Sequence, residues 1–276
     1  MLCSFLGFTK QAYYQQLRYV RKEIEQDLSI RCIVTDIRQD MPTIGGKKLW
    51  KMLNRMHIPI GRDKLYNWLS SNDLLLRYKS QKAPKTTDSS QWLRQFDNLV
   101  KNKEVTGINQ VWVSDITYLN VGDEFAFLSL ITDVYSRRIV GWKVWPTLGT
   151  DGSYIALEHA IEECGKAGFN DLIHHSDRGV QYCSKRYTKL LKANGMAIST
   201  TQDGSPYDNA IAERVNGILK EEFIKNRTYD TIEEIEKAID NYVTIYNCKR
   251  PHTSLNYNCP DDIYYGRQKG KMKKIY

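Results

Sequence analysis

Three acidic residues stand in positions where their chemistry calls for an explanation. Asp115 lies in the middle of VWVSDITYL, a stretch typical of a strand, in phase with the valines that should face a core. Burying an unpaired charge is costly, so such a residue is expected to be paired or to bind a metal ion. Asp177 ends the stretch LIHHSD, and ligands bind at the carboxyl ends of strands in open α/β sheets. On their own, a solvated edge-strand Asp115 and an ordinary turn at Asp177 remain alternatives.

The third acid, Glu213, belongs to SPYDNAIAERVNGILK at 205–220. Wound as a helix, this stretch has one apolar face and a single polar line at Asn209, Glu213, Asn216 and Lys220. A polar line is by default the solvated face of a helix. Glu213 therefore points to chemistry only if the fold supplies partners for it.

Grouped carboxylates favour one kind of site. Three of them repel one another and raise one another's pKa unless a cation neutralises them. Ligand sets made only of oxygen select Mg²⁺ or Mn²⁺ rather than zinc. Two such ions, about 4 Å apart, can clamp the attacking and leaving oxygens of an in-line phosphoryl transfer. Lys220, two helical turns after Glu213, is placed to hold a phosphate beside them.

The second part of the chain alternates between strands and helices in a way that would bring these acids together. The runs NQVWVSDITYLNV and EFAFLSLITDVYS predict a hairpin around Gly122-Asp123. Three antiparallel strands followed by helix-strand-helix-strand-helix are typical of a mixed α/β architecture. The expected strands cover 109–121, 124–136, 138–147, 171–177 and 196–201, and the expected helices cover 152–164, 184–194, 205–220 and 231–246.

The first hundred residues read as short helices, at Gln11–Leu28, 49–56 and Arg62–Leu69. The last two flank a Pro-Gly break at 59–61, which suggests a helix-turn-helix-like unit. The polar stretch YKSQKAPKTTDSS at 78–90 is an expected linker.

Positive charge is concentrated in this helical part. Residues 1–105 hold 19 Lys and Arg against 10 Asp and Glu, a net charge of +9, whereas the remainder has a net charge of −1. Localised positive charge indicates a polyanion, most often nucleic acid; a basic solubility face is the alternative. The candidate DNA-binding residues here are Lys47, Lys48, Arg62 and Lys64.

Composition excludes several other classes of protein. The chain has 276 residues, is 41% hydrophobic and has a mean hydropathy of −0.53, as expected for a globular protein. No apolar run approaches the ~18 residues of a membrane span, and the first residues do not resemble a secretory signal. Six scattered cysteines form no CxxC pair, so we expect reduced thiols.

The chain resembles the catalytic, OrfB-type transposases of bacterial insertion sequences, in the retroviral-integrase-like DDE superfamily. The resemblance covers nearly the whole chain. It is carried by VWVSDITYL, ITDVYSRRIVGW (131–142), HHSDRGVQY (174–182), SPYDNAIAERVNGILKEE (205–222) and YNCKRPHTSLNYNCP (246–260), which occur in the family's order.

The resemblance implies an α/β fold with an RNase H-like core, a five-stranded mixed sheet with flanking helices, preceded by a small all-α helix-turn-helix-like domain. The expected boundaries are 1–90 for the helical DNA-binding region with its linker, 91–227 for the catalytic core, and 228–276 for the last helix and tail. We expect a cytoplasmic, nucleoid-associated bacterial protein.

The same resemblance implies the chemistry. Asp115, Asp177 and Glu213 correspond to the metal-binding catalytic acids, and Lys220 to a basic residue that contacts DNA near the reacting end. Two Mg²⁺ ions are expected, with Mn²⁺ as a substitute, and no zinc. Activated water would release a 3′-hydroxyl at the element end, and this hydroxyl would then attack a second phosphodiester.

Four further residues have two interpretations each. His175 shares strand phase with Asp177 and either hydrogen-bonds a metal ligand or phosphate or is structural. Asn209 either orients Glu213 or caps its helix. Arg250 and His252 in the tail either touch DNA or pin the last helix to the core.

The expected partners are DNA, both element ends and target, and further copies of the chain, because joining two ends needs at least a dimer. In related elements an upstream reading frame supplies another helix-turn-helix, which we expect this chain to lack, so its product is a candidate partner. Two alternatives to a transposase remain: a DNA-binding subunit that is inactive without that partner, and an RNase H-like nuclease.

Overall fold

The computed structural model describes residues 7, 9–76, 96–165, 169, 171–201, 209–225 and 227–267. The predicted linker at 78–90 lies outside the described residues, and so does the start of the predicted helix at 205–220. The predicted strands and the other predicted helices fall within the described part of the chain.

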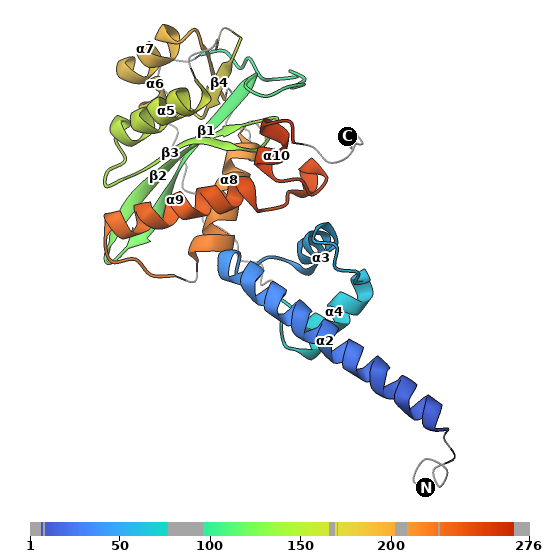
Figure 1. The fold of residues 1–276 in the computed structure, drawn as a ribbon. Coiled ribbons are helices and arrows are strands. Elements are labelled where there is room, and N and C mark those ends of the chain that lie inside the picture. The colour runs from blue at the N-terminus through green and yellow to red at the C-terminus, as the bar shows by residue number, and fades with distance from the viewer. Residues whose placement is uncertain are drawn as a thin grey trace.

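A five-stranded mixed sheet forms the centre of the molecule, in the order β3-β2-β1-β4-β5 (Figure 1). Its first three strands form an antiparallel meander, and β4 and β5 are parallel to β1. The predicted five-stranded α/β architecture is confirmed, with the strand that carries Asp115 at its centre. The strands are β1 (Val111–Val121), β2 (Glu124–Asp133), β3 (Ile139–Trp145), β4 (Ile173–Ser176) and β5 (Ala197–Thr200).

Helices cover both faces of the sheet. One face packs on α5 (Thr150–Cys164), α6 (Val180–Cys183) and α7 (Lys185–Ala193), and the other on α8 (Ala210–Leu219) and α9 (Ile232–Cys248) (Figure 1). At Gly141, strand β3 lies very close to α5. A Cβ added to Gly141 would be 2.2 Å from the carbonyl oxygen of Ala156. Only glycine allows this approach.

The helix that carries Glu213 changes from α-helical to π-helical geometry at its end. Helix α8 continues directly into a π-helical turn, η1 (Lys220–Ile224). π-helical turns inside helices occur frequently at functional sites. Lys220 therefore stands at the junction between α8 and η1.

The N-terminal region consists of α2 (Lys10–Asp40), α3 (Gly46–Arg55) and α4 (Arg62–Ser71). The last two confirm the predicted pair of short helices. Helix α2 extends well past the predicted end at Leu28, because Ile30, Val34 and Ile37 repeat at helical spacing and are buried.

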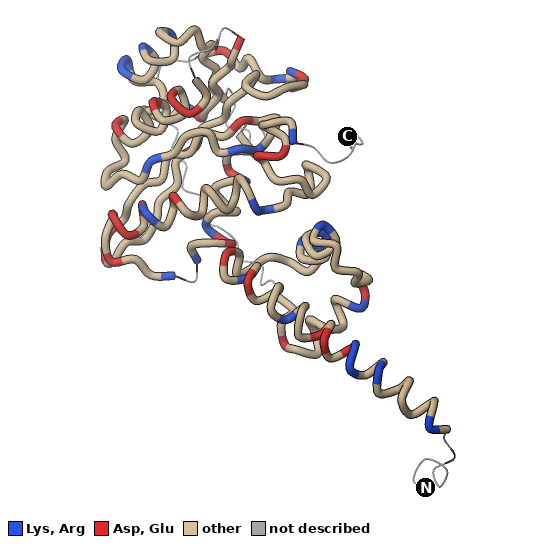
Figure 2. Tube along the Cα trace, in the orientation of Figure 1, with Lys and Arg blue, Asp and Glu red and all other residues tan. Residues whose placement is uncertain are grey.

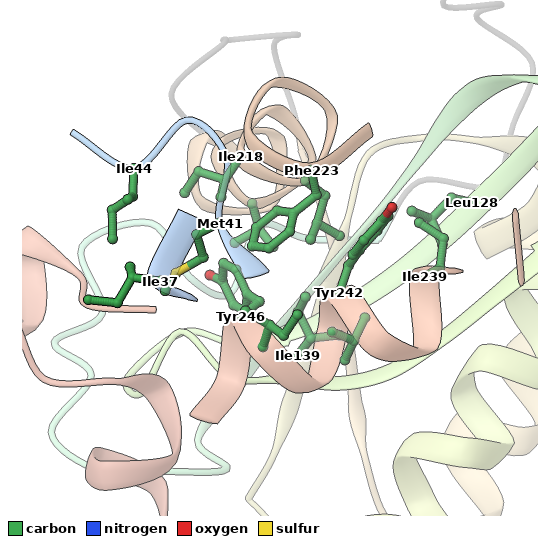
Figure 3. Close-up of a cluster of buried hydrophobic side chains, with 14 of the residues drawn as sticks. Ile37, Met41, Ile44, Leu128, Ile139, Ile218, Phe223, Ile239, Tyr242 and Tyr246 are labelled. Carbon is green, nitrogen blue, oxygen red and sulfur yellow. The ribbon is translucent and has the colours of Figure 1, made fainter. Parts of the chain in front are cut away.

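The N-terminal helices share one hydrophobic core with the sheet domain and α9. This buried cluster includes residues from all three predicted segments of the chain. Figure 3 shows side chains from α2 and the turn after it packed near α8, η1 and α9: Ile37, Met41, Ile44, Ile218, Phe223 and Tyr246. The N-terminal helical region is thus held to the sheet domain by side-chain packing as well as by the covalent link between them.

Residues 249–267, expected only as a tail, contain two further short elements. The tail forms a 3₁₀ turn, η2 (Thr253–Leu255), and a short helix, α10 (Pro260–Tyr264), whose Pro260 stands at the helix start where proline is favoured. Among the described residues, no helix is long and apolar enough to cross a membrane.

Candidate active site

Asp115 and Asp177 lie side by side on neighbouring parallel strands. Strands β1 and β4 pair in register up to Ser114 and Ser176, and each aspartate is the next residue along its chain. Neighbouring strands are about 4.8 Å apart, so the two carboxylates leave the same face of the sheet as near neighbours. The fold therefore brings the first two predicted acids together.

Burial makes both carboxylates costly to ionise. It raises the pKa of Asp115 to about 7, an effect that a hydrogen bond from Asn216 opposes and the negative charges of Asp177 and Glu213 increase. Burial also raises the pKa of Asp177, against the backbone N–H of Gly179, which donates to its Oδ1 at 2.9 Å. Two neighbouring half-buried carboxylates with raised pKa values form a site that a divalent ion can neutralise.

Glu213 does not complete a metal cluster in this conformation. It is exposed on the first turn of α8, near enough for its charge to raise the pKa of Asp115. Within the described ranges, no three Asp, Glu, His or Cys side chains come close enough to hold a metal ion. Joint coordination by all three acids therefore stays a prediction.

Two asparagines hold α8 against the strand that carries Asp115. The Asn216 side-chain amide donates to Asp115 Oδ2 at 2.8 Å, and that of Asn209 donates to the carbonyl oxygen of Ser114 at 3.0 Å. Asn209 does not cap α8 through its side chain, nor does it touch the Glu213 carboxylate; its backbone oxygen accepts from the Glu213 N–H at 3.1 Å. Asn209 thus anchors α8 to β1 rather than orienting the Glu213 carboxylate.

Asn216 was not singled out from the sequence as a site residue, although it belongs to the polar line of 205–220. Its place one turn after Glu213 was the available signal. The side-chain oxygens of Asn209 and Asn216 are buried and have no hydrogen-bond partner among the described residues. Buried polar atoms of this kind are rare and need an explanation such as a missing water or ion.

Lys220 lies near Asp115. Its Nζ sits 3.9 Å from the centre of the Tyr118 ring on β1, a favourable cation–π distance. Burial lowers the pKa of Lys220, and the charge of Asp115 opposes the shift. The structure therefore puts Lys220 near Asp115, while its contact with DNA stays a prediction.

The two histidines of β4 fit structural roles. His175 is fully buried on the Asp177 face, and its Nδ1 lies 2.8 Å from Ser199 Oγ on β5. His174 points the other way and contacts Ser114 Oγ at 2.7 Å and the Tyr187 hydroxyl at 2.9 Å. Burial lowers the pKa of His174 to about 3, so it is neutral.

Three of the predicted DNA-binding residues are exposed on the N-terminal helices. Lys47 lies on α3, and Arg62 and Lys64 lie in the first turn of α4. Arg62 forms a solvent-exposed ion pair with Asp63 at 2.8 Å, which contributes little and leaves its guanidinium available.

Lys48 is placed differently from its prediction as a DNA-binding residue, and Arg250 fits the second of its two interpretations. Arg250 is 2% exposed, donates twice to Glu222 at 2.8 and 2.6 Å, and contacts His252 Nε2 at 2.9 Å. Lys48 Nζ lies 3.3 Å from the same carboxylate. Both cations are turned inward, so this structure fits the pinning role for Arg250 and offers neither residue to DNA.

Glu222 is the centre of this cluster, which we call the Glu222 clamp: Lys48, Glu222, Arg250 and His252. Burial alone would raise the pKa of Glu222, but the hydrogen bonds and charges of Arg250 and Lys48 lower it below its ordinary value. Burial lowers the pKa of Lys48 to about 8, with the Arg250 charge acting in the same direction. The clamp ties α3 and the tail to η1, immediately after the helix of Glu213.

Comparison with known proteins identifies the family. Residues 106–206 and 194–260 match two Integrase core domain families. The chain is 30% identical over 283 residues to the transposase for insertion sequence element IS629 of Shigella sonnei, covering 96% of this chain and 91% of that one. It belongs to the insertion-sequence transposases of the integrase superfamily. The transposase is therefore a polynucleotidyl transferase with an RNase H-like sheet.

Other relatives match smaller parts of the transposase. The transposase for element IS904 of Lactococcus lactis subsp. lactis is 35% identical over 162 residues, which is 58% of this chain and 63% of that one. The magnesium complex of the HTLV-2 integrase catalytic core domain is similar in structure, with a TM-score of 0.44 and 16% identity over 57% of this chain and 97% of that chain. That structural likeness is too weak to add to the family assignment.

Asn216 offers a first test of the site. We expect Asn216→Ala to slow DNA cleavage by about 10- to 100-fold, the usual cost of removing a hydrogen-bond partner of a metal ligand, which is the role proposed below for Asp115. Single-turnover cleavage rates measure the effect, with the exposed Asn241→Ala on α9 as the matched control. Equal rates for the two variants would show that the contact with Asp115 does not contribute to catalysis.

Proposed function

We propose that this transposase performs divalent-metal-dependent cleavage at the ends of an insertion sequence and joins the resulting 3′-hydroxyl to target DNA. The observation that carries the proposal is the pairing of Asp115 and Asp177 on adjacent parallel strands, where burial raises the pKa of both carboxyls. The family assignment supports the same reaction class.

The donor set fits Mg²⁺. Asp115 and Asp177 supply carboxylate oxygens, which Mg²⁺ and Mn²⁺ prefer, and Glu213 is the proposed third ligand. Bound divalent ions would stabilise the charge on the attacking and leaving oxygens. Glu213, exposed on the first turn of α8, would have to move toward the two aspartates.

The chain's own residues would position the reacting groups. Asn216 holds the Asp115 carboxylate in one orientation, and Asn209 anchors the start of α8 to β1. Lys220, held over the Tyr118 ring, would bind a DNA phosphate next to the acids. Positioning of this kind lowers the barrier of phosphoryl transfer without covalent chemistry by the protein.

A second candidate function is a DNA-binding subunit whose catalytic half assembles only with another protein. The observation that favours it is the exposed position of Glu213 outside any metal cluster of the described residues. For the transposase DNA would be the substrate, and for the DNA-binding subunit it would be the ligand. In both cases the proposed protein partners are further copies of this chain or an upstream-frame protein.

One assay separates these functions and a simple nuclease. Purified protein is incubated with Mg²⁺ and DNA that bears the element's terminal repeats. Joined products support the transposase, retarded but intact DNA supports the binding subunit, and degradation without joining supports the nuclease. We expect joined products.

The exposed cations of the N-terminal helices give a further prediction. We expect the triple variant Lys47→Ala, Arg62→Ala, Lys64→Ala to bind DNA more weakly. The slope of the logarithm of its DNA-binding constant against the logarithm of salt concentration should become shallower by about 0.9 for each DNA phosphate that the variant no longer neutralises. Affinities measured across a salt series test this. The control, Lys189→Ala with Lys192→Ala, removes exposed cations from α7; an unchanged slope in the triple variant would place the DNA surface elsewhere.

A further inference from the structure

Most of the first two-thirds of α2 projects from the rest of the described chain; its first side-chain hydrogen bonds to another segment are made by Gln26, which donates to the carbonyl oxygen of Pro59, and by Asp27, which accepts from Trp68. Residues 10–29 contain no buried side chain, and the first buried residue of the helix is Ile30. Figure 1 shows this part of α2 projecting away from the rest of the chain. Most of the stability of a helix in a protein comes from packing of an amphipathic face rather than from propensity.

An apolar line runs along the projecting part. Its members follow one another at intervals of four, three, four and four residues, which places them on one face. Four of them are far from buried: Tyr13 is 50% exposed, Val20 39%, Ile24 55% and Leu28 56%. We call this line the α2 seam: Tyr13, Leu17, Val20, Ile24 and Leu28.

The seam has the features of a helix-pairing surface. Its intervals of three and four residues are those by which two packed helices interlock their side chains. Contiguous exposed apolar residues mark interaction sites. The seam ends where α4 comes alongside, since Trp68 Nε1 donates to Asp27 and the Arg31 guanidinium lies 5.9 Å from the Trp68 ring centre.

Charge along the same stretch is divided into two halves. The part from 10 to 22 carries only cations and the part from 23 to 28 carries only carboxylates, a division visible in Figure 2. The cations are Lys10, Arg18, Arg21 and Lys22, and the carboxylates are Glu23, Glu25 and Asp27.

We propose that two copies of this chain associate by antiparallel packing of their α2 seams. In this arrangement the basic half of each helix lies beside the acidic half of the other, whereas a parallel pair would place like charges together. A DNA ligand would account for the four cations but not for the apolar seam or the carboxylates. A second copy accounts for all three, because each helix carries both halves of the complementary pattern.

The first test is the mass of the full chain in solution without DNA, measured by light scattering. We expect a dimer, twice the chain mass of 32.1 kDa. Ile24→Lys should raise the dimer dissociation constant at least about tenfold, since it places a charge in the seam. Gln15→Lys adds the same charge at an exposed position on the opposite side of α2 and should leave the mass unchanged. A monomeric wild type, or a dimer that Ile24→Lys does not weaken, overturns the proposal.

Charge exchange tests the partner. Arg18→Glu with Arg21→Glu should weaken the dimer, and adding Glu23→Lys with Glu25→Lys should restore it. Restoration requires that the two halves meet in the dimer. If the fourfold variant stays monomeric while circular dichroism shows an intact helix, the complementary pairing is wrong.

Disulfide trapping tests the direction. In a chain with exposed Cys32 and Cys248 replaced by serine, Tyr13→Cys and Leu28→Cys are made in separate preparations. Antiparallel seams predict a cross-link in the mixture and not in either preparation alone. Cross-links within each separate preparation would establish a parallel pair and contradict the proposal.

Discussion

Asp177→Asn is expected to abolish DNA cleavage and joining while DNA retention stays nearly unchanged. The amide keeps the size of the side chain and an oxygen that can accept from the Gly179 N–H, as Asp177 does now. It lacks the negative charge that a divalent ion needs. Removing a metal ligand worth several kcal/mol of transition-state stabilisation reduces the rate by about 10³-fold or more.

The matched control for this variant is Asp171→Asn. Asp171 is exposed just before β4, so the same chemical change is made away from the carboxylate pair. Strand-transfer product yield and gel retention are measured for both variants. Full activity of Asp177→Asn would remove Asp177 from the proposed metal site, and an equal decrease in both variants would point to a general effect on folding.

Glu222→Ala is expected to destabilise the protein by about 3–5 kcal/mol, the usual cost of removing one partner from a buried ion pair. Arg250 would keep its buried position, 2% exposed, without the two hydrogen bonds to Glu222. Lys48 would be deprived of its ion-pair partner at the same time. Urea unfolding of the full chain measures the change.

Glu221→Ala is the control for the clamp. Glu221 is the neighbouring acid, and its ion pair with Lys225 is exposed, so its removal should cost about 0.5 kcal/mol or less. If Glu222→Ala unfolds at the same urea concentration as Glu221→Ala, the clamp does not hold α3 and the tail to η1.

The sheet could be predicted because its signals are local. The hairpin around Gly122 and the short strand before Asp177 have strand patterns that the fold did not override. Asp115 broke the local pattern, and it lies at the site that the strand pairing builds. These features needed no knowledge of distant contacts.

The remaining features depend on contacts between distant segments. The inward orientation of Arg250 and Lys48 follows from Glu222, which is 28 residues from one and 174 from the other. No spacing rule connects residues so far apart. Asn216 was visible on the polar line of 205–220, but only the packing of α8 on β1 shows that it donates to Asp115 rather than to water.

The full length of α2 was missed for a different reason. Its second half is fixed by burial of Ile30, Val34 and Ile37 in a core shared with α8 and α9. The turn signals that usually end a helix are absent before Pro42. Residues 10–29 belong to the same helix, although none of their side chains is buried.

The central claim is that Asp115, Asp177 and Glu213 converge on divalent metal when DNA is bound. A crystal of the transposase with terminal-repeat DNA and Mn²⁺ tests it through the anomalous signal of the metal. We predict a peak within about 2.2 Å of carboxylate oxygens from all three residues. A metal peak away from Asp115 and Asp177, or one with Glu213 still pointing to solvent, would contradict the account.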